Sequence, residues 1–404
     1  MIDHRKLGRE LDLFVSDPLV GAGLPIWLPA GSAARHAVEE YVRELERRAG
    51  YQHVYSPPLG RRELFALSGH LGHFADEMFP PMRLGGDELL LRPALCPHHA
   101  LVYRARGRSY RELPLRVGEL GGMYRAERSG VLGGLARVRA ISLNDAHNFC
   151  TLEQVGDEVR EILRLIRQAH AALGVRPAGF RLSLRGPGAR YVGDDASWAR
   201  AEELLRSALD GVDHVAAPGE AAFYGPKIDI QVVDAAGRES TISTVQIDFD
   251  KPEKFDLSYT DAAGARQRPV LVHRSLVGSM ERLFAYLIEA HGGAFPPWYA
   301  PVQLLLLPVD AGQADAVDRL ARRAVDAGLR VEVDAGGSLG ARVRDAARRR
   351  VPYVGVVGAR EAADDAVALR LRDGRSLDPM PAADAVRLIG AVVAARSAEL
   401  LPAG

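Results

Sequence analysis

The chain has 404 residues and a mass of 43.8 kDa, which at roughly 100–200 residues per domain predicts two or three domains. Apolar residues make up 47% and charged residues 26%, a globular balance that excludes a disordered or fibrous chain. Basic and acidic residues both number 52, so any contact with nucleic acid must come from local patches rather than from the net charge.

The cysteine content and the first residues bear on the compartment. Cys96 and Cys150 are too few for a disulfide scaffold and favour a reducing environment. The first ten residues are too polar for a signal peptide, and no apolar run reaches the ~18–20 residues that span a bilayer. We therefore expect a soluble, cytoplasmic protein with no membrane contact. Only four of the 52 basic residues are lysine, so the position of a lysine is more informative than usual in this arginine-rich chain.

Hydrophobic periodicity predicts a first region in which helices accompany an antiparallel sheet. Glycine-rich residues 130–134 are expected to form the loop of a long hairpin. In chain order, we expect a helix at Ser32–Gly50, a strand at Tyr51–Ser56, the hairpin at Pro114–Arg139, a helix at Leu152–Leu173, β-rich stretches at Phe223–Val233 and Ser240–Phe249, and a helix at Ser275–Ala290.

The composition changes at Phe295–Pro301, a proline- and aromatic-rich segment that is typical of a domain boundary. We place the two domains at residues 1–298 and 299–404. Beyond the boundary, strands and helices alternate, which predicts a small α/β domain with a mixed sheet. The expected elements are strand Val302–Val309, helix Ala314–Ala327, strand Arg330–Val333, helix Leu339–Arg349, strands Tyr353–Val357 and Ala366–Leu371, and helix Ala382–Ala395.

Two short blocks, Cys96–His99 and Asp145–Cys150, hold both cysteines and three of the twelve histidines. Their spacing leaves two interpretations open: a metal site, or buried cysteines with structural histidines. A catalytic zinc needs only three protein ligands, so Cys96 and His147 with a distant His273 would suffice, but only the fold could assemble them. The sequence has no P-loop and no G-x-G-x-x-G after a strand, so an ATP site must be of another type.

Several arginines flank the expected hairpin or lie near the later helix. Guanidinium groups suit phosphate oxygens, although in so arginine-rich a chain a solvated surface explains any single one equally well or better. Arg125 and Glu127 alternate by two, which on a strand places both on one face. Lys227 is a rare lysine in an apolar strand, and functional and structural explanations are equally open. The remaining candidates are Arg116, Arg137, Arg139, Arg274 and Arg282.

Together these blocks resemble the threonyl-tRNA synthetases, a family of class II aminoacyl-tRNA synthetases, from residue 3 to about residue 396. The resemblance implies an α+β protein: a catalytic domain with an antiparallel sheet, followed by a small α/β anticodon-binding domain with a mixed sheet. The matching segments are Asp3–Gly8, Pro57, Cys96–His99, Ser109–Arg116, Tyr124–Glu127, Leu135–Arg139, Asp145–His147, Ala222–Asp229, Thr244–Phe249, Val272–Arg274 and Gly278–Arg282.

The resemblance implies that L-threonine is activated with ATP and Mg²⁺ and passed to tRNA(Thr) by a homodimer with Pro57 near its interface. It also implies one Zn²⁺ per subunit, held by Cys96, His147 and His273. The implied amino-acid contacts are Asp145, Tyr224 and Gln246. The implied ATP contacts are Arg125, Glu127, Arg137, Ile141, Gln246, Ser279 and Arg282. The implied catalytic residues are Arg125, Lys227, Arg282 and, for transfer, His70. The implied anticodon contacts are Arg350, Glu361 and Arg370.

The sequence departs from the family pattern in four respects. The family's N-terminal regions, including the domain that hydrolyses misacylated serine, have no counterpart, so we expect no editing domain in this chain. Ile141 stands where the family commonly stacks a Phe on adenine, and Leu143 where it commonly has Gln. The segment Ala335–Ser338 is one residue shorter at a position where the family has a polar base contact. Lys251 and Phe255 replace aliphatic residues beside an inhibitor pocket.

These departures leave two alternatives open. One is a synthetase-like paralogue that hands an activated amino acid to a non-tRNA acceptor or has a regulatory binding role. The other is an inhibitor-resistant second copy of the synthetase.

Overall fold

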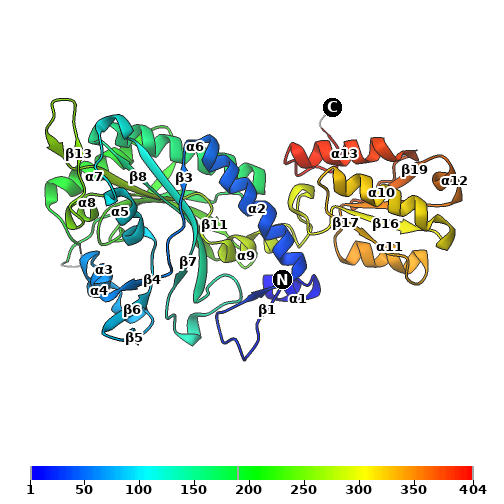
Figure 1. Ribbon diagram of the computed structural model, residues 1–404, viewed down its shortest axis with the longest axis horizontal. Coiled ribbons are helices and arrows are strands. Elements are labelled where there is room, and N and C mark those ends of the chain that lie inside the picture. The colour runs from blue at the N-terminus through cyan, green and yellow to red at the C-terminus, as the bar shows by residue number, and fades with distance from the viewer. Residues whose placement is uncertain (1, 189–190, 403–404) are drawn as a thin grey trace.

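The computed structural model describes residues 2–188 and 191–402 and has two units, each built around its own sheet (Figure 1). Neighbouring strands of the larger, eight-stranded sheet are antiparallel except for the two edge pairs, which are parallel. In spatial order the strands are β10 (His214–Pro218), β9 (Gly179–Leu184), β11 (Lys227–Val233), β12 (Glu239–Asp248), β15 (Val270–Ser275), β8 (Ala140–Cys150), β7 (Leu115–Tyr124) and β3 (Gln52–His53).

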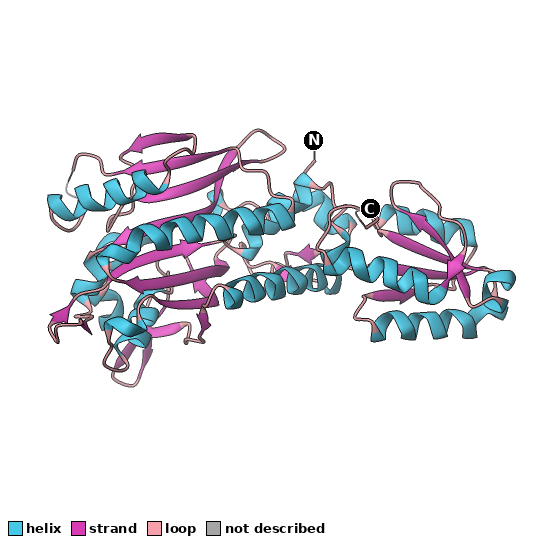
Figure 2. Ribbon diagram, turned by 90° about the horizontal axis from the view of Figure 1, so that it is seen from above, coloured by secondary structure: helices cyan, strands magenta, loops and turns pink. Residues whose placement is uncertain are grey.

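Helices cover the large sheet and close its core (Figure 2). The apolar stripe of α6 (Val155–Leu173) is buried against β12 and β15, and Gly174, at φ 74°, ends that helix. The other helices of this unit are α1 (His4–Glu10), α2 (Pro29–Arg48), α3 (Arg62–Leu67), α4 (His70–His73), α5 (Cys96–Arg104), α7 (Asp195–Ala208), α8 (Asp250–Lys254) and α9 (Met280–Ala290).

Short strands complete the larger unit. They form a three-stranded sheet and two small hairpins at its periphery. These strands are β4 (Leu59–Arg61), β6 (Asp87–Leu91) and β5 (Met82–Leu84), β1 (Phe14–Val15) with β2 (Ile26–Trp27), and β13 (Tyr259–Thr260) with β14 (Arg266–Gln267).

The smaller unit has the mixed sheet that the alternating pattern predicts. Its strand Leu304–Pro308, which has a neighbouring strand on each side, is apolar throughout, because alternate residues pack into cores on opposite faces of the sheet. In spatial order its strands are β17 (Val331–Val333), β16 (Leu304–Pro308), β18 (Tyr353–Val357), β19 (Ala366–Leu371) and β20 (Met380–Pro381), and its helices are α10 (Ala314–Asp326), α11 (Leu339–Arg348), α12 (Ala359–Ala363) and α13 (Ala382–Ala394).

Several expected elements have different bounds, and three of them have an identifiable cause. The strand expected at Tyr51–Ser56 covers only β3, because Ser56 donates its N–H to the Glu119 carboxylate (3.2 Å) instead of to a neighbouring strand. The hairpin exists, but its second strand is β8, which begins after Arg139, so residues 125–139 form its loop. The helix expected at Ser275–Ala290 begins at Met280, because the residues before it belong to β15 and a turn.

A packed connection joins the two units. The short 3-10 helix Pro297–Tyr299 places the Trp298 ring against Tyr41, and the Trp298 indole donates to the Ala172 carbonyl at 3.1 Å. Gln303 and Arg330, from the smaller unit, donate to carbonyl oxygens of this connection. The placement of the domain boundary between residues 298 and 299 stays a prediction.

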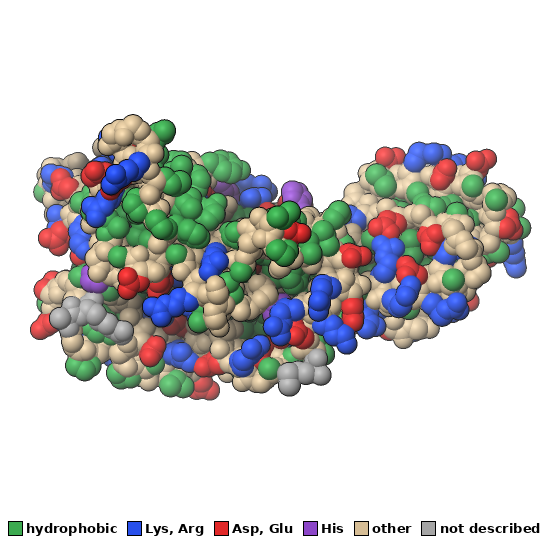
Figure 3. Space-filling view, turned by 90° about the horizontal axis from the view of Figure 1, so that it is seen from below, with side chains coloured by type: hydrophobic (Ala, Val, Ile, Leu, Met, Phe, Trp, Pro, Cys, Tyr) green, Lys and Arg blue, Asp and Glu red, His purple; other side chains and the backbone are tan. Residues whose placement is uncertain are grey.

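The surface carries both signs of charge. On the face in Figure 3, acidic and basic side chains are intermixed over both units, as the zero net charge leads one to expect. Among the residues described, no helix combines the length and apolar character needed to cross a bilayer.

Candidate functional site

A cavity of about 520 Å³ lies on the large sheet and gathers residues that are far apart in the chain. Its lining includes every residue that the family resemblance implies for binding a metal, an amino acid or ATP, or for catalysis. These are His70, Cys96, Arg125, Glu127, Arg137, Ile141, Asp145, His147, Tyr224, Lys227, Gln246, His273, Ser279 and Arg282.

The strand register explains how four of these side chains come together. His147 on β8 lies opposite His273 on β15, His273 lies opposite Gln246 on β12, and Gln246 lies opposite Lys227 on β11. Directly paired residues share a face of the sheet, so the four form one row across four strands. The row runs from the imidazoles at the closed end of the cavity to the ammonium of Lys227.

The closed end of the cavity holds a group of metal-ligand type. Cys96, the first residue of α5, joins His147 and His273, and the ligand atoms of the three lie within 4.8 Å of one another. All three side chains are buried. A thiolate and two imidazoles form a donor set of the kind that binds zinc, and three protein ligands leave a position for a further ligand.

Hydrogen bonding around the two imidazoles fits a cation. A chain of four contacts runs from Glu119 through His99, His147 and His273 to Asp248, with ring and carboxylate atoms 2.7–3.1 Å apart. Four hydrogen bonds between these groups need four protons, but three neutral imidazoles and two carboxylates supply only three.

A cation between His147 Nε2 and His273 Nδ1 removes this mismatch, because each ring then donates its single N–H outward. This is the arrangement in which a hydrogen-bonded partner orients a metal-binding histidine. The 2.9 Å between the two nitrogens is a few tenths shorter than the ~3.4 Å that a tetrahedral zinc would impose.

Three residues that were not predicted orient this group, and the sequence carries a detectable signal for two of them. Asp248 lies two residues after Gln246 on β12, so both face the cavity side of the sheet. His99 lies three residues after Cys96 on α5 and therefore shares its helix face. Glu119, buried beside Arg92, had no such signal.

Burial controls the protonation of this end of the cavity. It raises the pKa of the Cys96 thiol to about 12 and lowers the pKa of His147 well below its usual range. Burial also raises the pKa of Asp145 to about 7, despite the positive charge of Arg274. Neutral imidazoles keep lone pairs for a cation, and a bound cation favours the thiolate form of cysteine.

A fully buried lysine lies behind the metal-ligand group. Lys251 Nζ is 3.1 Å from Asp248 Oδ2, the oxygen that also receives the N–H of His273, and 3.5 Å from the centroid of the Tyr224 ring. Burial alone would raise the pKa of Asp248, but the charge of Lys251 and the hydrogen bond from His273 lower it to about 2. The other cysteine, Cys150, lies apart, with its thiol directed to the Val270 carbonyl.

The mouth of the cavity is positively charged. Arg125, Arg137 and Arg282 line it, and the Glu127 carboxylate, 2.8 Å away, pairs with Arg137. Enclosure within the cavity walls and then the charges of Arg125 and Arg137 lower the pKa of Arg282. Arg125 and Glu127 follow β7 in the loop rather than on a strand, so the expectation that strand alternation aligns them is wrong.

The remaining predicted residues contact one another in the middle of the cavity. Tyr224 donates its hydroxyl proton to Gln246 Oε1 at 2.6 Å, and Lys227 pairs with Asp229 at 2.7 Å. His70 stands at the metal-ligand group, with its Nε2 3.9 Å from Cys96 Sγ. Burial, followed by the charge of Lys251, lowers the pKa of His70 well below its usual range.

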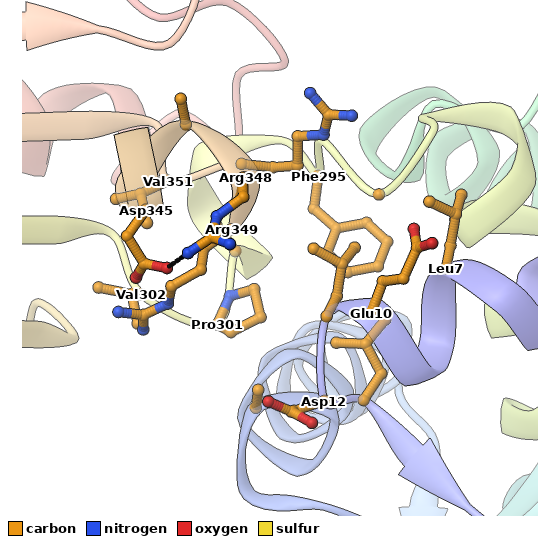
Figure 4. Close-up of a pocket in the computed structure, with 17 residues that line it drawn as sticks. Leu7, Glu10, Asp12, Phe295, Pro301, Val302, Asp345, Arg348, Arg349 and Val351 are labelled. Atoms are coloured by element: carbon orange, nitrogen blue, oxygen red, sulfur yellow. Dashed lines mark hydrogen bonds and ion pairs between the residues drawn. The ribbon is translucent and has the colours of Figure 1, made fainter. Parts of the chain in front are cut away.

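A larger cavity, of about 850 Å³, lies between the two units (Figure 4). Glu10 and Asp12 project from the α1 side and Arg349 from the α11 side. Among the three residues predicted to contact an anticodon, only Arg350 lines it. Glu361 instead accepts the Gly358 N–H at 3.0 Å at the start of α12. The structure therefore does not gather the three residues into this cavity, and their role stays a prediction.

Family models and curated relatives match most of the chain. Residues 81–291 match the tRNA synthetase class II core domain (G, H, P, S and T), and residues 303–391 match an anticodon binding domain. The threonine–tRNA ligase of Geobacillus sp. (strain WCH70) is 45% identical over 397 residues, which cover 97% of this chain and 62% of the relative. That of Lacticaseibacillus paracasei is 48% identical over 375 residues, 91% of this chain and 57% of the relative. The chain thus spans about 60% of the length of such relatives.

Solved structures show the same arrangement. The RNA binding domain of threonyl-tRNA synthetase from Cryptosporidium parvum Iowa II has a TM-score of 0.91 and 33% identity, covering 100% of this chain and 99% of that one. Prolyl-tRNA synthetase from Giardia lamblia, in complex with prolyl-adenylate, has a TM-score of 0.72 at 19% identity, over 98% of this chain and 79% of that one. At that identity the likeness shows the fold alone.

Proposed function

Because the chain belongs to the class II aminoacyl-tRNA synthetases, in the threonyl-tRNA synthetase family, we propose that it activates L-threonine and transfers it to tRNA(Thr). In the first step a threonine carboxylate oxygen bonds to the α-phosphorus of ATP and pyrophosphate leaves. In the second, a terminal ribose hydroxyl of the tRNA attacks the activated carbonyl and AMP leaves. The observation that carries this proposal is one cavity with three metal-ligand side chains at its closed end and three arginines at its mouth.

The closed end is suited to a β-hydroxy amino acid. Cys96, His147 and His273 would hold Zn²⁺, which when bound supplies open coordination positions for the amino and hydroxyl groups of the substrate. Valine lacks the hydroxyl group, and a site built around such a group rejects the analogue that lacks it. Serine keeps the hydroxyl and lacks only a methyl group, so this pocket would discriminate against it by only about 10- to 200-fold.

Polar side chains beside the metal-ligand group would fix the rest of the amino acid. Asp145 lies at the closed end, where its carboxylate would accept hydrogen bonds from the ammonium group. Tyr224 and Gln246 hold each other through their 2.6 Å hydrogen bond and form the adjoining wall. Lys227, in line with Gln246 on the next strand, would lie beside the reacting carboxylate.

The mouth of the cavity is suited to the triphosphate of ATP, which would enter with Mg²⁺. Arg125 would bind oxygens of the α-phosphate, and Arg137 would bind the γ-phosphate. Arg282 would lie against the base of the nucleotide. Their charges would offset the charge that develops during in-line displacement. The remaining proposed nucleotide contacts are Glu127, Ile141, Gln246 and Ser279.

Transfer would involve tRNA at two places. His70, beside Cys96, would assist the attack of the ribose hydroxyl, and the smaller unit would bind the anticodon through Arg350, Glu361 and Arg370. A homodimer is part of the proposal. Its support is the surface around Pro57, where Tyr55 is 91% exposed. Sedimentation of the purified protein would test the dimer.

The decisive experiment charges tRNA(Thr) with threonine and with serine on one preparation whose zinc content is measured. We expect one zinc per chain, threonine charging, and weaker charging with serine. Threonine-dependent pyrophosphate exchange without charging would favour a non-tRNA acceptor, and the absence of both would favour a binding role. Either result would contradict the proposal.

An inhibitor-resistant second copy is the other candidate, and one observation favours it. Lys251 and Phe255 are both fully buried, and Lys251 lies against the ring of Tyr224, which lines the cavity. Replacing both with leucine should restore sensitivity to an inhibitor that binds there. Equal sensitivity of the variant and the parent would remove this candidate.

A further inference from the structure

The N-terminal helix α1 contributes one buried side chain to the catalytic unit, and the proposed function does not use it. His4, the first residue of α1, is buried, and its Nδ1 lies 2.7 Å from Glu289 Oε1 in the last turn of α9. Its Nε2 accepts the backbone N–H of Leu135 at 3.2 Å. Because Nε2 accepts a proton, the ring carries its single proton on Nδ1 and donates it to Glu289.

The hydrogen bond to Leu135 connects α1 with the loop that carries the nucleotide-binding residues. The carbonyl of Ala136, the next residue, receives the Nε–H of Arg282 at 3.4 Å, and Arg137 follows directly. The imidazole of His4 thus bridges α9, which carries Arg282, and the loop segment that carries Arg137.

The glycine before Leu135 fits the same contact. Gly134 has a φ of 55°, a conformation that favours glycine, and a Cβ added there would lie 2.4 Å from His4 Nε2. A side chain at position 134 would therefore displace the imidazole. Asp3, His4 and Glu289 also place three ligand-type atoms within 4.8 Å, but both nitrogens of His4 are engaged, so the cluster is structural.

From this geometry we propose that His4 is a positioning residue for the nucleotide loop. By tying the Leu135 N–H to Glu289, it holds Arg137 and Arg282 in the arrangement that receives the phosphates. This inference rests on the proposed function for the identity of the ligand. The contact between His4 and Leu135 does not involve the groups proposed to bind threonine. Loosening it should weaken ATP binding and leave threonine binding unchanged.

Two substitutions separate the two hydrogen bonds of the ring. In His4→Gln the side-chain oxygen reaches the position of Nε2 and can still accept from Leu135, whereas His4→Asn places its amide near Nδ1 and keeps only the Glu289 contact. Both variants lose one hydrogen bond, so both should lower the melting temperature by similar amounts. We expect His4→Asn to raise KM for ATP about five- to tenfold and His4→Gln to change it less than about twofold.

The measurement is pyrophosphate exchange with ATP and threonine varied separately, together with calorimetric binding of a non-hydrolysable ATP analogue without threonine. Gly134→Ala should reproduce His4→Asn, and Arg9→Ala, on the exposed side of α1, should match the parent. Equal effects of His4→Asn and His4→Gln on KM for ATP, or equal shifts in KM for ATP and threonine, would overturn the inference. Failure of the parent in exchange would overturn the proposed function, while analogue binding would still test His4.

Discussion

The two ends of the cavity are built differently. At the closed end, Cys96, His147 and His273 come from a helix and two central strands, and each imidazole has a hydrogen-bonded partner before any ligand arrives. At the mouth, Arg125 and Arg137 lie in the loop after β7, and the side chain of Arg137 is 50% exposed. The group proposed to select the amino acid is thus fixed in the core, whereas two of the three arginines proposed to bind the phosphates lie on a loop.

Because of this difference, substitutions at the two ends should affect stability and substrate binding differently. At the closed end, one substitution leaves other buried polar groups without partners, which affects both stability and binding. At the mouth, one substitution mainly removes a charge or a hydrogen-bond donor that would act on bound substrate, so it should affect activity more than stability. Four changes, from the largest expected effect to the smallest, test the contrast.

Cys96→Ser should abolish metal retention and reduce threonine-dependent pyrophosphate exchange by more than about 100-fold, because the site loses its thiolate ligand. Metal content and exchange rate are measured on the same sample. Cys150→Ser is the matched control, since that thiol is equally buried but directed to the Val270 carbonyl, and it should keep its metal. A Cys96→Ser variant with full metal content would contradict the assignment.

Arg125→Lys should lower kcat for exchange by about 100-fold while the melting temperature stays unchanged, because lysine keeps the charge but loses the planar pair of donors. Arg128→Lys, an exposed position on the same loop, should behave like the parent. Steady-state kinetics and thermal unfolding check the pair. A loss of stability at Arg125 comparable to that at the closed end would break the contrast between the two ends.

Asp248→Asn should weaken metal binding about 10- to 100-fold, because His273 loses its orienting carboxylate. It should also cost about 3–5 kcal/mol of unfolding free energy, because Lys251 is left buried without a partner. Adding Lys251→Met should recover most of that stability and leave metal binding weak. Competition with a chelator and urea unfolding separate the two effects, and recovery of both properties in the double variant would contradict the role of Asp248.

Ile141→Phe should tighten ATP binding by about two- to tenfold, because it adds an aromatic face for the base at the mouth of the cavity. KM for threonine should not change, since the closed end is untouched. Ile141→Val serves as the control for a change of side chain without an aromatic ring. An unchanged KM for ATP in Ile141→Phe would show that the base does not lie against this position.

The sequence predicts the elements with strong periodicity and the resemblance supplies the site residues, but neither supplies the assembly. The helix expected at Leu152–Leu173 is present as α6, because its apolar stripe and Gly174 are local signals. The strand at Tyr51–Ser56 fails at Ser56, whose N–H is taken by a carboxylate 63 residues away, which no local pattern reports.

The same limit applies to the site. Asp248 could have been found from its alternation with Gln246, since both lie on one strand. The burial of Lys251 could not have been predicted, because it depends on how Tyr224 and Asp248 pack around the ammonium group in three dimensions. Residues that depend on one element are therefore predictable, and residues that depend on several are not.

The connection between the two units has a consequence for a ligand that spans both of them. Its carbonyl oxygens are engaged by side chains of the smaller unit: Arg372 on Phe295, Gln303 on Pro297, and Arg330 on Trp298 and Ala300. Hydrogen bonds within the chain itself therefore hold the spacing between the two units. Under the proposed function, a tRNA that contacts both units would have to fit this spacing.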